Sequence, residues 1–157
     1  MNISSNTSPL ILLDKISLLP ILKSIFVEIN IPEAVNSEWL RPANYKIPEF
    51  IKTKTILSDY TSLLKTLLST LDQGEAEAIT LAKQETSDIL LIDELRGRKI
   101  AKEHGLKIIG TGGILVEAKR RGLIPLLKPV LDELIKHRYR IDANLYNEML
   151  KRAGEKR

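Results

Sequence analysis

The hydrophobic pattern alternates between short apolar runs and longer amphipathic segments, which is typical of an α/β protein. The short runs predict strands at residues 3–5, 27–31, 88–93 and 106–109, and an edge strand within 47–57. The run at 88–93 reads DILLID, a continuous apolar stretch between two acids. Such a stretch is expected of a central parallel strand, which is buried on both faces.

Segments with helical periodicity separate and follow these strands. They are predicted at 9–14, 18–26, 32–39, 59–71, 75–85, 95–104, 114–121, 126–138 and 143–153. Gly105 and Gly122 follow two of these helices as left-handed caps, and residues 110–113 (GTGG) form a turn into a helix. The alternation of strands and helices predicts a three-layer α/β/α sandwich with a central, mostly parallel sheet. The 157 residues fit one domain spanning 1–157.

Composition restricts the chemistry that this chain can carry. The absence of cysteine excludes disulfides, thiolate zinc sites and cysteine nucleophiles, and two histidines are too few for a histidine-rich metal site. Metal chemistry would therefore depend on oxygen ligands, which favour Mg²⁺ or Mn²⁺. The 24 Lys and Arg residues exceed the 20 Asp and Glu residues, for a net charge of +4. This mild excess permits nucleic-acid binding without requiring it.

Membrane and export signals are not apparent in the pattern. No apolar run approaches the roughly 18 residues that a membrane span needs. Residues 1–13 carry Ser and Asn where a signal peptide would have its positive charge. We therefore expect a cytoplasmic protein that does not enter a membrane.

Polar side chains follow the predicted strands, at the edge where parallel sheets bind ligands. Asn6 follows the first strand, Glu38 lies on the helix after the second, and Asp93 and Glu94 follow the DILLI run. Glu75 lies in the first turn of a helix. Converging carboxylates raise one another's pKa unless a cation is present, so the pattern suggests a Mg²⁺ or Mn²⁺ site. Such a site can activate water and hold a phosphodiester for in-line attack.

The same residues lie in five segments that together carry a family resemblance. These segments are SNTSPLI (5–11), IPEAVNSEW (31–39), LDQGEAEAITLA (71–82), DILLIDELRGRKIA (88–101) and GLKIIGTGGILVEAKRRGLI (105–124). The chain resembles a PIN domain, the nuclease fold of VapC-type toxins. More closely, it resembles a PIN-like bacterial and archaeal family of predicted nucleic-acid-binding proteins. The segments cover nearly the whole chain and occur in the family's order.

The resemblance assigns a role to each candidate acid. The first PIN acid falls on Asn6, the second on Glu38 and the third on Glu75. The fourth falls on Glu94 by its spacing to the following helix, but the adjacent Asp93 could serve instead. The resemblance implies that these five residues hold Mg²⁺ or Mn²⁺ and that the four acids among them are catalytic.

Nucleic-acid contacts are expected beside these acids. Thr7 and Ser8 match the small hydroxyl residues that follow the first PIN acid. Arg96 and Arg98 come directly after the fourth acid and could hold RNA phosphates near the metal. A solvated helix face, or pairing of these arginines with the carboxylates, is the alternative for both.

The chain departs from the family pattern at Asn6, where PIN nucleases usually have Asp. An amide oxygen can ligate Mg²⁺ but brings no negative charge, so metal affinity should fall. Asn6 could also be simply an N-cap for the following helix. Two functions therefore remain open. One is a divalent-metal-dependent endoribonuclease that is the toxin of a toxin–antitoxin pair. The other is a weakened or inactive PIN-like module that binds nucleic acid or protein.

The resemblance also implies partners. These are RNA, a small antitoxin that covers the acidic pocket, and a second copy of the chain in a homodimer. Apolar helices at 10–26 and 63–71 could supply the dimer surface. A third reading, an unrelated domain with a phosphate ligand at 110–113, is weakened because this loop lacks the P-loop lysine.

Overall fold

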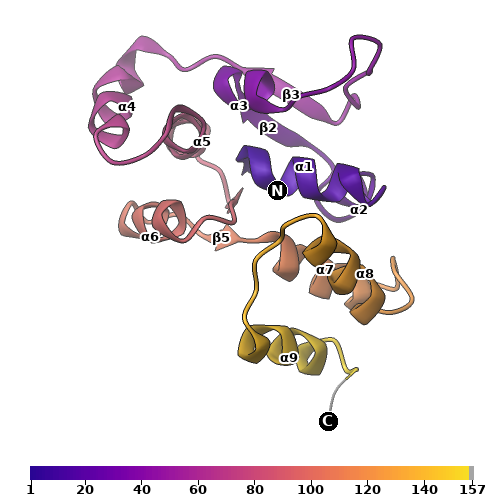
Figure 1. The fold of residues 1–157 in the computed structure, drawn as a ribbon. Helices are drawn as coiled ribbons and strands as arrows, with labels where there is room; N and C mark the ends of the chain where they lie inside the picture. The colour runs from indigo at the N-terminus through magenta and orange to yellow at the C-terminus, as the bar shows by residue number, and fades with distance from the viewer. Residues whose placement is uncertain (156–157) are drawn as a thin grey trace.

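A five-stranded parallel sheet forms the centre of the molecule, as the sequence predicts. The computed structural model describes residues 1–155. Over these residues the strand order is β3-β2-β1-β4-β5, and every neighbouring pair is parallel (Figure 1). The strands are β1 (Ile3–Ser5), β2 (Ile29–Pro32), β3 (Ile51–Lys54), β4 (Ile89–Leu91) and β5 (Ile108–Ile109). The expected strand within 47–57 is confirmed as β3, at one edge of the sheet.

Helices cover both faces of this sheet and confirm the three-layer sandwich (Figure 1). On one side lie α1 (Thr7–Lys15), α2 (Ile21–Phe26) and α7 (Thr111–Arg120). On the other lie α4 (Thr61–Leu68), α5 (Gln73–Gln84) and α6 (Leu95–Glu103). Right-handed crossovers explain this division, because the chain runs outward from β1 to β2 and in the opposite direction from β3 to β4 and β5.

Four further elements complete the described chain. A short helix, α3 (Glu33–Glu38), follows β2, and a 3₁₀ turn, η1 (Ser58–Tyr60), precedes α4. The last two helices are α8 (Lys128–Lys136) and α9 (Ala143–Arg152), and α9 packs on α7. None of the helices in residues 1–155 is both long and apolar enough to cross a membrane.

The core lies between the sheet and the helices on each side. Ile3 of β1 and Leu90 of β4 are fully buried because these central strands are covered on both faces. Helix α5 approaches the sheet closely because Ala78 and Ala82 are small, and its Ile79 is also fully buried. Burying one such isoleucine stabilises the fold by about 1.5–3 kcal/mol.

The predicted beginning of α7 is wrong. The sequence places a turn at 110–113 and a helix from 114, whereas α7 begins at Thr111. Gly112 and Gly113 therefore lie inside the first helical turn. Gly112 allows close packing there, because a Cβ atom would come within 2.7 Å of Tyr139 Oη and 2.6 Å of Met149 Sδ and would force these side chains to shift. These glycines serve close packing and do not form a phosphate-binding loop.

Two other boundaries move for local reasons. The helix predicted at 59–71 divides into η1 and α4, which ends at Leu68. The strand predicted at 27–31 begins two residues later, because Val27 adopts a positive φ of 73° after α2. Pro32 then ends β2 and caps α3, so it does not begin that helix.

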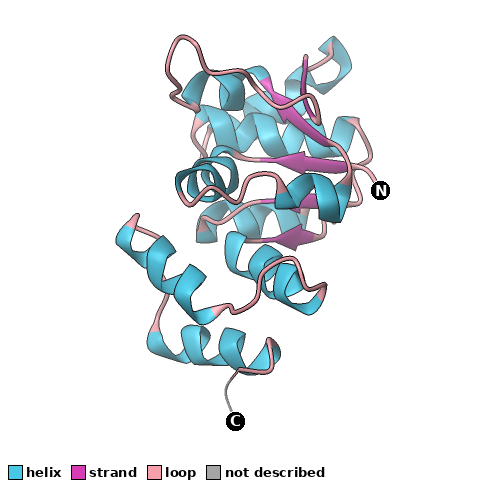
Figure 2. Cartoon of the chain, turned by 90° about the vertical axis from the view of Figure 1, so that its right-hand side faces the viewer, coloured by secondary structure: helices cyan, strands magenta, loops and turns pink. Residues whose placement is uncertain are grey.

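The sheet brings the carboxyl ends of its strands to one edge of the molecule. Figure 2 shows that the strands point in the same direction. The residues that follow β1, β2 and β4 therefore meet at this edge, although the sequence separates them by up to 88 positions.

Candidate functional site

Asn6 marks the start of the site, directly after β1. Its backbone N–H donates to Leu91 O of β4 at 2.9 Å, which fixes its place between the two central strands. Asn6 occupies the N-cap position of α1, but its side chain makes no capping hydrogen bond. Instead, Nδ2 donates to Glu94 Oε2 at 3.2 Å. The Asn6 side chain therefore binds Glu94, at the beginning of α6, and does not cap α1.

The first turn of α1 holds two of the candidate acids. Thr7 Oγ1 donates to Glu38 Oε2 at 2.7 Å, and Ser8 Oγ donates to Glu94 Oε1 at 2.5 Å. Hydrogen bonds from a hydroxyl group to an ionised carboxylate are short and strong. Thr7 and Ser8, which the sequence suggested for nucleic-acid contacts, therefore contact the second and fourth acids directly.

Glu38 is the last residue of α3, and its carboxylate lies against the beginning of α5. A Cβ atom on Gly74 would come within 2.6 Å of Glu38 Oε1. A side chain at position 74 would force the Glu38 carboxylate to move away from α5. The close approach of α3 and α5 thus places the Glu38 carboxylate at Gly74, the residue before Glu75.

Glu75 is buried in the first turn of α5, with 9% of its surface exposed. Its backbone N–H donates to the N-cap residue Asp72 at 2.9 Å. Burial raises the pKa of Glu75 to about 7, and the hydrogen bond and charge of Asp72 and the charge of Glu94 act in the same direction. Its carboxylate faces α6, where a Cβ atom on Gly97 would come within 2.7 Å of Oε2.

Asp93 binds the beginning of α7 through both of its carboxylate oxygens. Its Oδ1 accepts from the backbone N–H of Thr111 at 2.7 Å, and its Oδ2 accepts from Thr111 Oγ1 at 2.7 Å. Burial raises the pKa of Asp93, while the two Thr111 bonds oppose that rise. Asp93 therefore caps the beginning of α7, where the N-cap residue Gly110 has no side chain to do so.

The two candidate arginines also have protein partners. Arg98 Nη1 donates to Ile92 O at 2.9 Å, and its charge lowers the pKa of Asp93. Arg96 Nη1 donates to Thr70 O at 3.2 Å. Arg98 therefore belongs to the Asp93 corner, and Arg96 extends toward the end of the loop before α5.

Together these contacts bring Asn6, Glu38, Glu75 and Glu94 around the beginning of α1. Two acceptor atoms in this group are buried without a hydrogen-bond partner, namely Asn6 Oδ1 and Glu75 Oε2. Buried oxygens of this kind are costly unless a donor or a cation satisfies them. The group contains oxygen ligands only, which fits Mg²⁺ or Mn²⁺.

The carboxylates do not converge fully by themselves. Across residues 1–155 no three acidic or histidine side chains are arranged to hold a metal ion. Glu38 and Glu94 point instead to the hydroxyl groups of Thr7 and Ser8. A cation would compete with these hydroxyl donors for the carboxylate oxygens.

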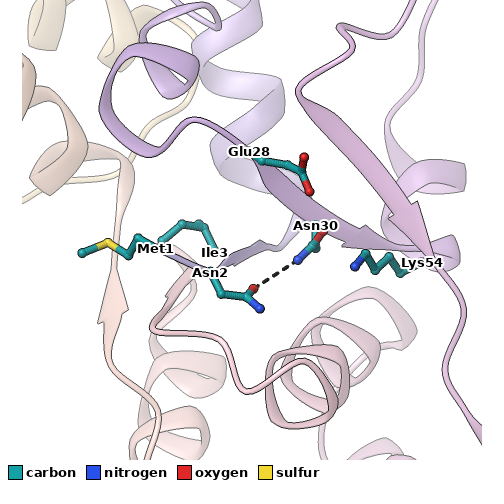
Figure 3. Close-up of a pocket in the computed structure, with 6 residues that line it drawn as sticks. All are labelled: Met1, Asn2, Ile3, Glu28, Asn30 and Lys54. Carbon is teal, nitrogen blue, oxygen red and sulfur yellow. Dashed lines mark hydrogen bonds between the residues drawn. The ribbon is translucent and has the colours of Figure 1, made fainter.

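A separate pocket lies beside the first residues of β1 and β2 and the end of β3, and it does not contain these residues. It has a volume of about 330 Å³ and is lined by Met1, Asn2, Ile3, Glu28, Asn30 and Lys54 (Figure 3). Asn30 Nδ2 donates to Asn2 Oδ1 at 3.1 Å within it. The pocket lining includes one acid and one lysine, and the lysine pairs with Glu85 at 2.8 Å, so the lining does not contain the acid cluster that the strand ends predict.

Comparison with known families agrees with the fold. A family profile described as a PIN domain matches residues 2–155. This match covers nearly the whole chain, so the protein belongs to the PIN domain family. PIN domains are generally nucleases and typically use divalent metal ions. No curated protein matches the sequence.

The sequence did not reveal how the glycines cradle the acids. Gly74 and Gly97 each leave the space that one carboxylate occupies. Gly97 gave a signal in the sequence. Glycine inside a helix costs about 1 kcal/mol relative to alanine, so its presence there indicates a packing reason. A second signal was Asp72 three residues before Glu75, the spacing of a capping box. Tyr139, which packs beside Asp93, gave no sequence signal at all.

Proposed function

We propose that this protein is a divalent-metal-dependent endoribonuclease with its site at Asn6, Glu38, Glu75 and Glu94. The observation that carries this proposal is the pair of buried, unpartnered acceptors, Asn6 Oδ1 and Glu75 Oε2, among carboxylates of a PIN domain. Both atoms are acceptors when Glu75 is ionised. A cation is the kind of partner that such atoms lack.

Each residue has a distinct part in this function. Glu38 and Glu94 supply negative charge, and Thr7 and Ser8 hold them in place. Asn6 orients Glu94 through Nδ2 and offers Oδ1 to the cation. Glu75 contributes a carboxylate from the first turn of α5. When bound there, a divalent cation supplies electrostatic stabilisation of the phosphodiester and lowers the pKa of a water molecule.

RNA cleavage by the purified protein tests this function directly. We expect cleavage of a labelled RNA with Mn²⁺ and none with EDTA. Glu38→Gln and Glu94→Gln should each lower the rate by about 100-fold or more, because each removes a charged ligand. Glu28→Gln makes the same change at the opposite edge of the sheet and should leave the rate unchanged. Cleavage that survives in both site variants would show that the site is elsewhere.

The alternative function, a binding module without turnover, is favoured by one observation. The first position of the acid set is Asn6, which carries no charge. A module of this kind would bind RNA or a protein with all four residues intact but would cleave nothing at any Mn²⁺ concentration. Gain of cleavage in Asn6→Asp would identify it as a weakened nuclease.

We also propose that the protein is a toxin and that a small antitoxin covers its site. Two exposed leucines support a protein partner at this place. Leu40 is 89% exposed two residues after Glu38, and Leu95 is 85% exposed directly after Glu94. Apolar side chains beside an acid cluster fit a partner that offers both apolar and basic residues. Co-purification with the product of a neighbouring small gene would test this.

A homodimer remains a prediction, but the surfaces suggested for it are largely used by the chain itself. Leu10, Leu13 and Leu22 are fully buried in the core, and Leu67 is nearly so. Leu68, at 37% exposure, is the leucine of the 63–71 segment that faces solvent most. Sedimentation analysis of the wild type would measure the oligomeric state.

A further inference from the structure

The connection between α8 and α9 concentrates positive charge at the carboxyl edge of the sheet. Residues 136–140 read KHRYR, and they are called the α8–α9 turn below. Lys136, Arg138 and Arg140 are all exposed, and the turn contains no acid. Figure 2 shows this connection, just before the last helix, on the side toward which the strands point. It therefore lies on the same side of the molecule as the acids.

Tyr139 anchors this turn beside the site. Its Oη accepts a hydrogen bond from the backbone N–H of Gly112 in the first turn of α7. Burial and the charge of Asp93 raise the pKa of Tyr139 to about 12. Asp93 in turn binds Thr111 and precedes Glu94 directly. A short series of contacts thus connects the turn to an acid of the proposed site.

The two arginines of the turn are unpaired, unlike others nearby in the sequence. Within the described residues neither Arg138 nor Arg140 makes an ion pair or a side-chain hydrogen bond. By contrast, Arg120 and Arg121 both bind Glu117. Unpaired guanidinium groups remain available for phosphate oxygens, which they bind in a bidentate manner.

Arg138 has a left-handed backbone conformation, which is unfavourable for a residue with a side chain. Its φ is 71°, and the N–H groups of Arg138 and Tyr139 close the end of α8 on Ile135 O and Leu134 O. This is the Schellman arrangement, which favours glycine at this position. Glycine occupies the position after α6, α7 and α9, whereas Ser17 and Thr86 follow α1 and α5. The backbone conformation therefore does not require an arginine at this position.

We propose that the α8–α9 turn binds the phosphate backbone of RNA through Arg138 and Arg140 and delivers it to the acid site. This inference rests on the proposed nuclease function, because that function defines the site to which the RNA is delivered. A cluster of carboxylates repels a polyanion, so nucleic acid needs free cations beside the cluster. Arg96 and Arg98, which the sequence suggested, are already bonded to backbone carbonyls. The turn supplies the unpaired cations on the same side.

Binding of a fluorescent single-stranded RNA in EDTA, at several salt concentrations, tests the turn without requiring cleavage. The double variant Arg138→Gln/Arg140→Gln should bind roughly tenfold more weakly. The slope of log affinity against log salt should fall by about 1.4, because each lost phosphate contact on a single strand contributes about 0.7. Lys23→Gln/Lys107→Gln removes the same charge from exposed positions that precede β2 and β5, and should leave both quantities nearly unchanged.

Arg138→Gly separates a binding role from a structural one. Glycine fits the left-handed conformation, so this variant should unfold at the same or a higher urea concentration while RNA binding weakens. A merely structural arginine would leave RNA binding unchanged in this variant. Unchanged RNA affinity in the double variant would overturn the proposal. The proposal would also be overturned if the double variant lost its binding to polyglutamate but kept its affinity for RNA. That result would indicate an acidic protein partner.

The outcomes also distinguish this inference from the function on which it rests. Wild-type protein that binds RNA through the turn but never cleaves it with Mn²⁺ would refute the nuclease and leave the turn as the RNA site. The opposite result is cleavage that depends on Glu38, with the same rate and the same RNA affinity in the double variant as in the wild type. That result would refute RNA binding by the turn and leave the nuclease function standing.

Discussion

Asn6 balances two opposing demands on the acid cluster. Without a cation, a carboxylate at this position would face Glu94, whereas the amide donates a hydrogen bond to it. The amide therefore removes one repulsion that the usual Asp would add. With a cation, the same amide contributes an oxygen but no charge. The neutral residue thus favours a stable metal-free protein over tight metal binding.

Asn6→Asp should reverse this balance. In EDTA we expect the variant to be less stable by about 1 kcal/mol, because a hydrogen bond to the exposed Glu94 becomes a repulsion between two carboxylates. Mn²⁺ should bind it more tightly, by roughly tenfold, and restore its stability. Urea unfolding in EDTA and calorimetric titration with Mn²⁺ measure the two effects.

The control for this variant is Asn44→Asp, the same change on an exposed loop. It should alter neither stability nor Mn²⁺ affinity. If Asn6→Asp were as stable as the wild type in EDTA, the contact between Asn6 Nδ2 and Glu94 would have no energetic weight.

Among the secondary-structure elements, α7 depends most on distant side chains for its beginning. Its N-cap residue is Gly110, so the first amide groups need partners from elsewhere. Asp93, from the end of β4, accepts from Thr111 N, and Tyr139 accepts from Gly112 N. One helix beginning thereby ties together β4, α7 and the α8–α9 turn.

Asp93→Ala should weaken this junction. We expect a loss of about 1–3 kcal/mol in the free energy of unfolding, because the N–H and hydroxyl groups of Thr111 lose their acceptor. A double-mutant cycle with Thr111→Val should be non-additive, since the two side chains share one interaction. Urea unfolding measures each variant. Loss of RNA cleavage with unchanged stability would instead assign Asp93 to the chemistry itself.

For the molecule as a whole, Glu75 gives stability an unusual dependence on pH. Its pKa rises from an ordinary value of 4.5 to about 7, so the folded protein binds its proton more tightly than the unfolded chain does. This contribution is present below pH 4.5 and is lost as pH rises through 7. The lowered pKa values of Glu85, Glu117, Asp132 and Glu155 act in the opposite direction, below pH 5.

We therefore expect Glu75→Gln to be more stable than the wild type at pH 8 in EDTA. The difference should be on the order of 2 kcal/mol at pH 8 and should shrink toward pH 5, where the wild-type carboxyl is neutral. Thermal or urea unfolding across this range measures it, with Glu103→Gln on the exposed face of α6 as the control. Parallel stability curves for Glu75→Gln and wild type would contradict the raised pKa.

Much of this architecture follows from local patterns in the chain. The apolar run at 88–93 could become a central strand because it is hydrophobic on both faces, and β4 lies in the middle of the sheet. The order of strands and helices limits the topology, because parallel crossovers are right-handed. Positions 6, 38, 75 and 94 could therefore be placed at one edge from sequence alone.

Tertiary contacts decided which of two neighbours faces the site. Asp93 and Glu94 are adjacent and both acidic, so no pattern separates them. Their partners do: Thr111, 18 residues away, takes both oxygens of Asp93, while Ser8, 86 residues away, binds Glu94. Consecutive side chains at a strand end point in different directions, and only long-range packing fixes which direction leads to the acids. The same packing, through Tyr139 and Gly112, brought the α8–α9 turn to this edge.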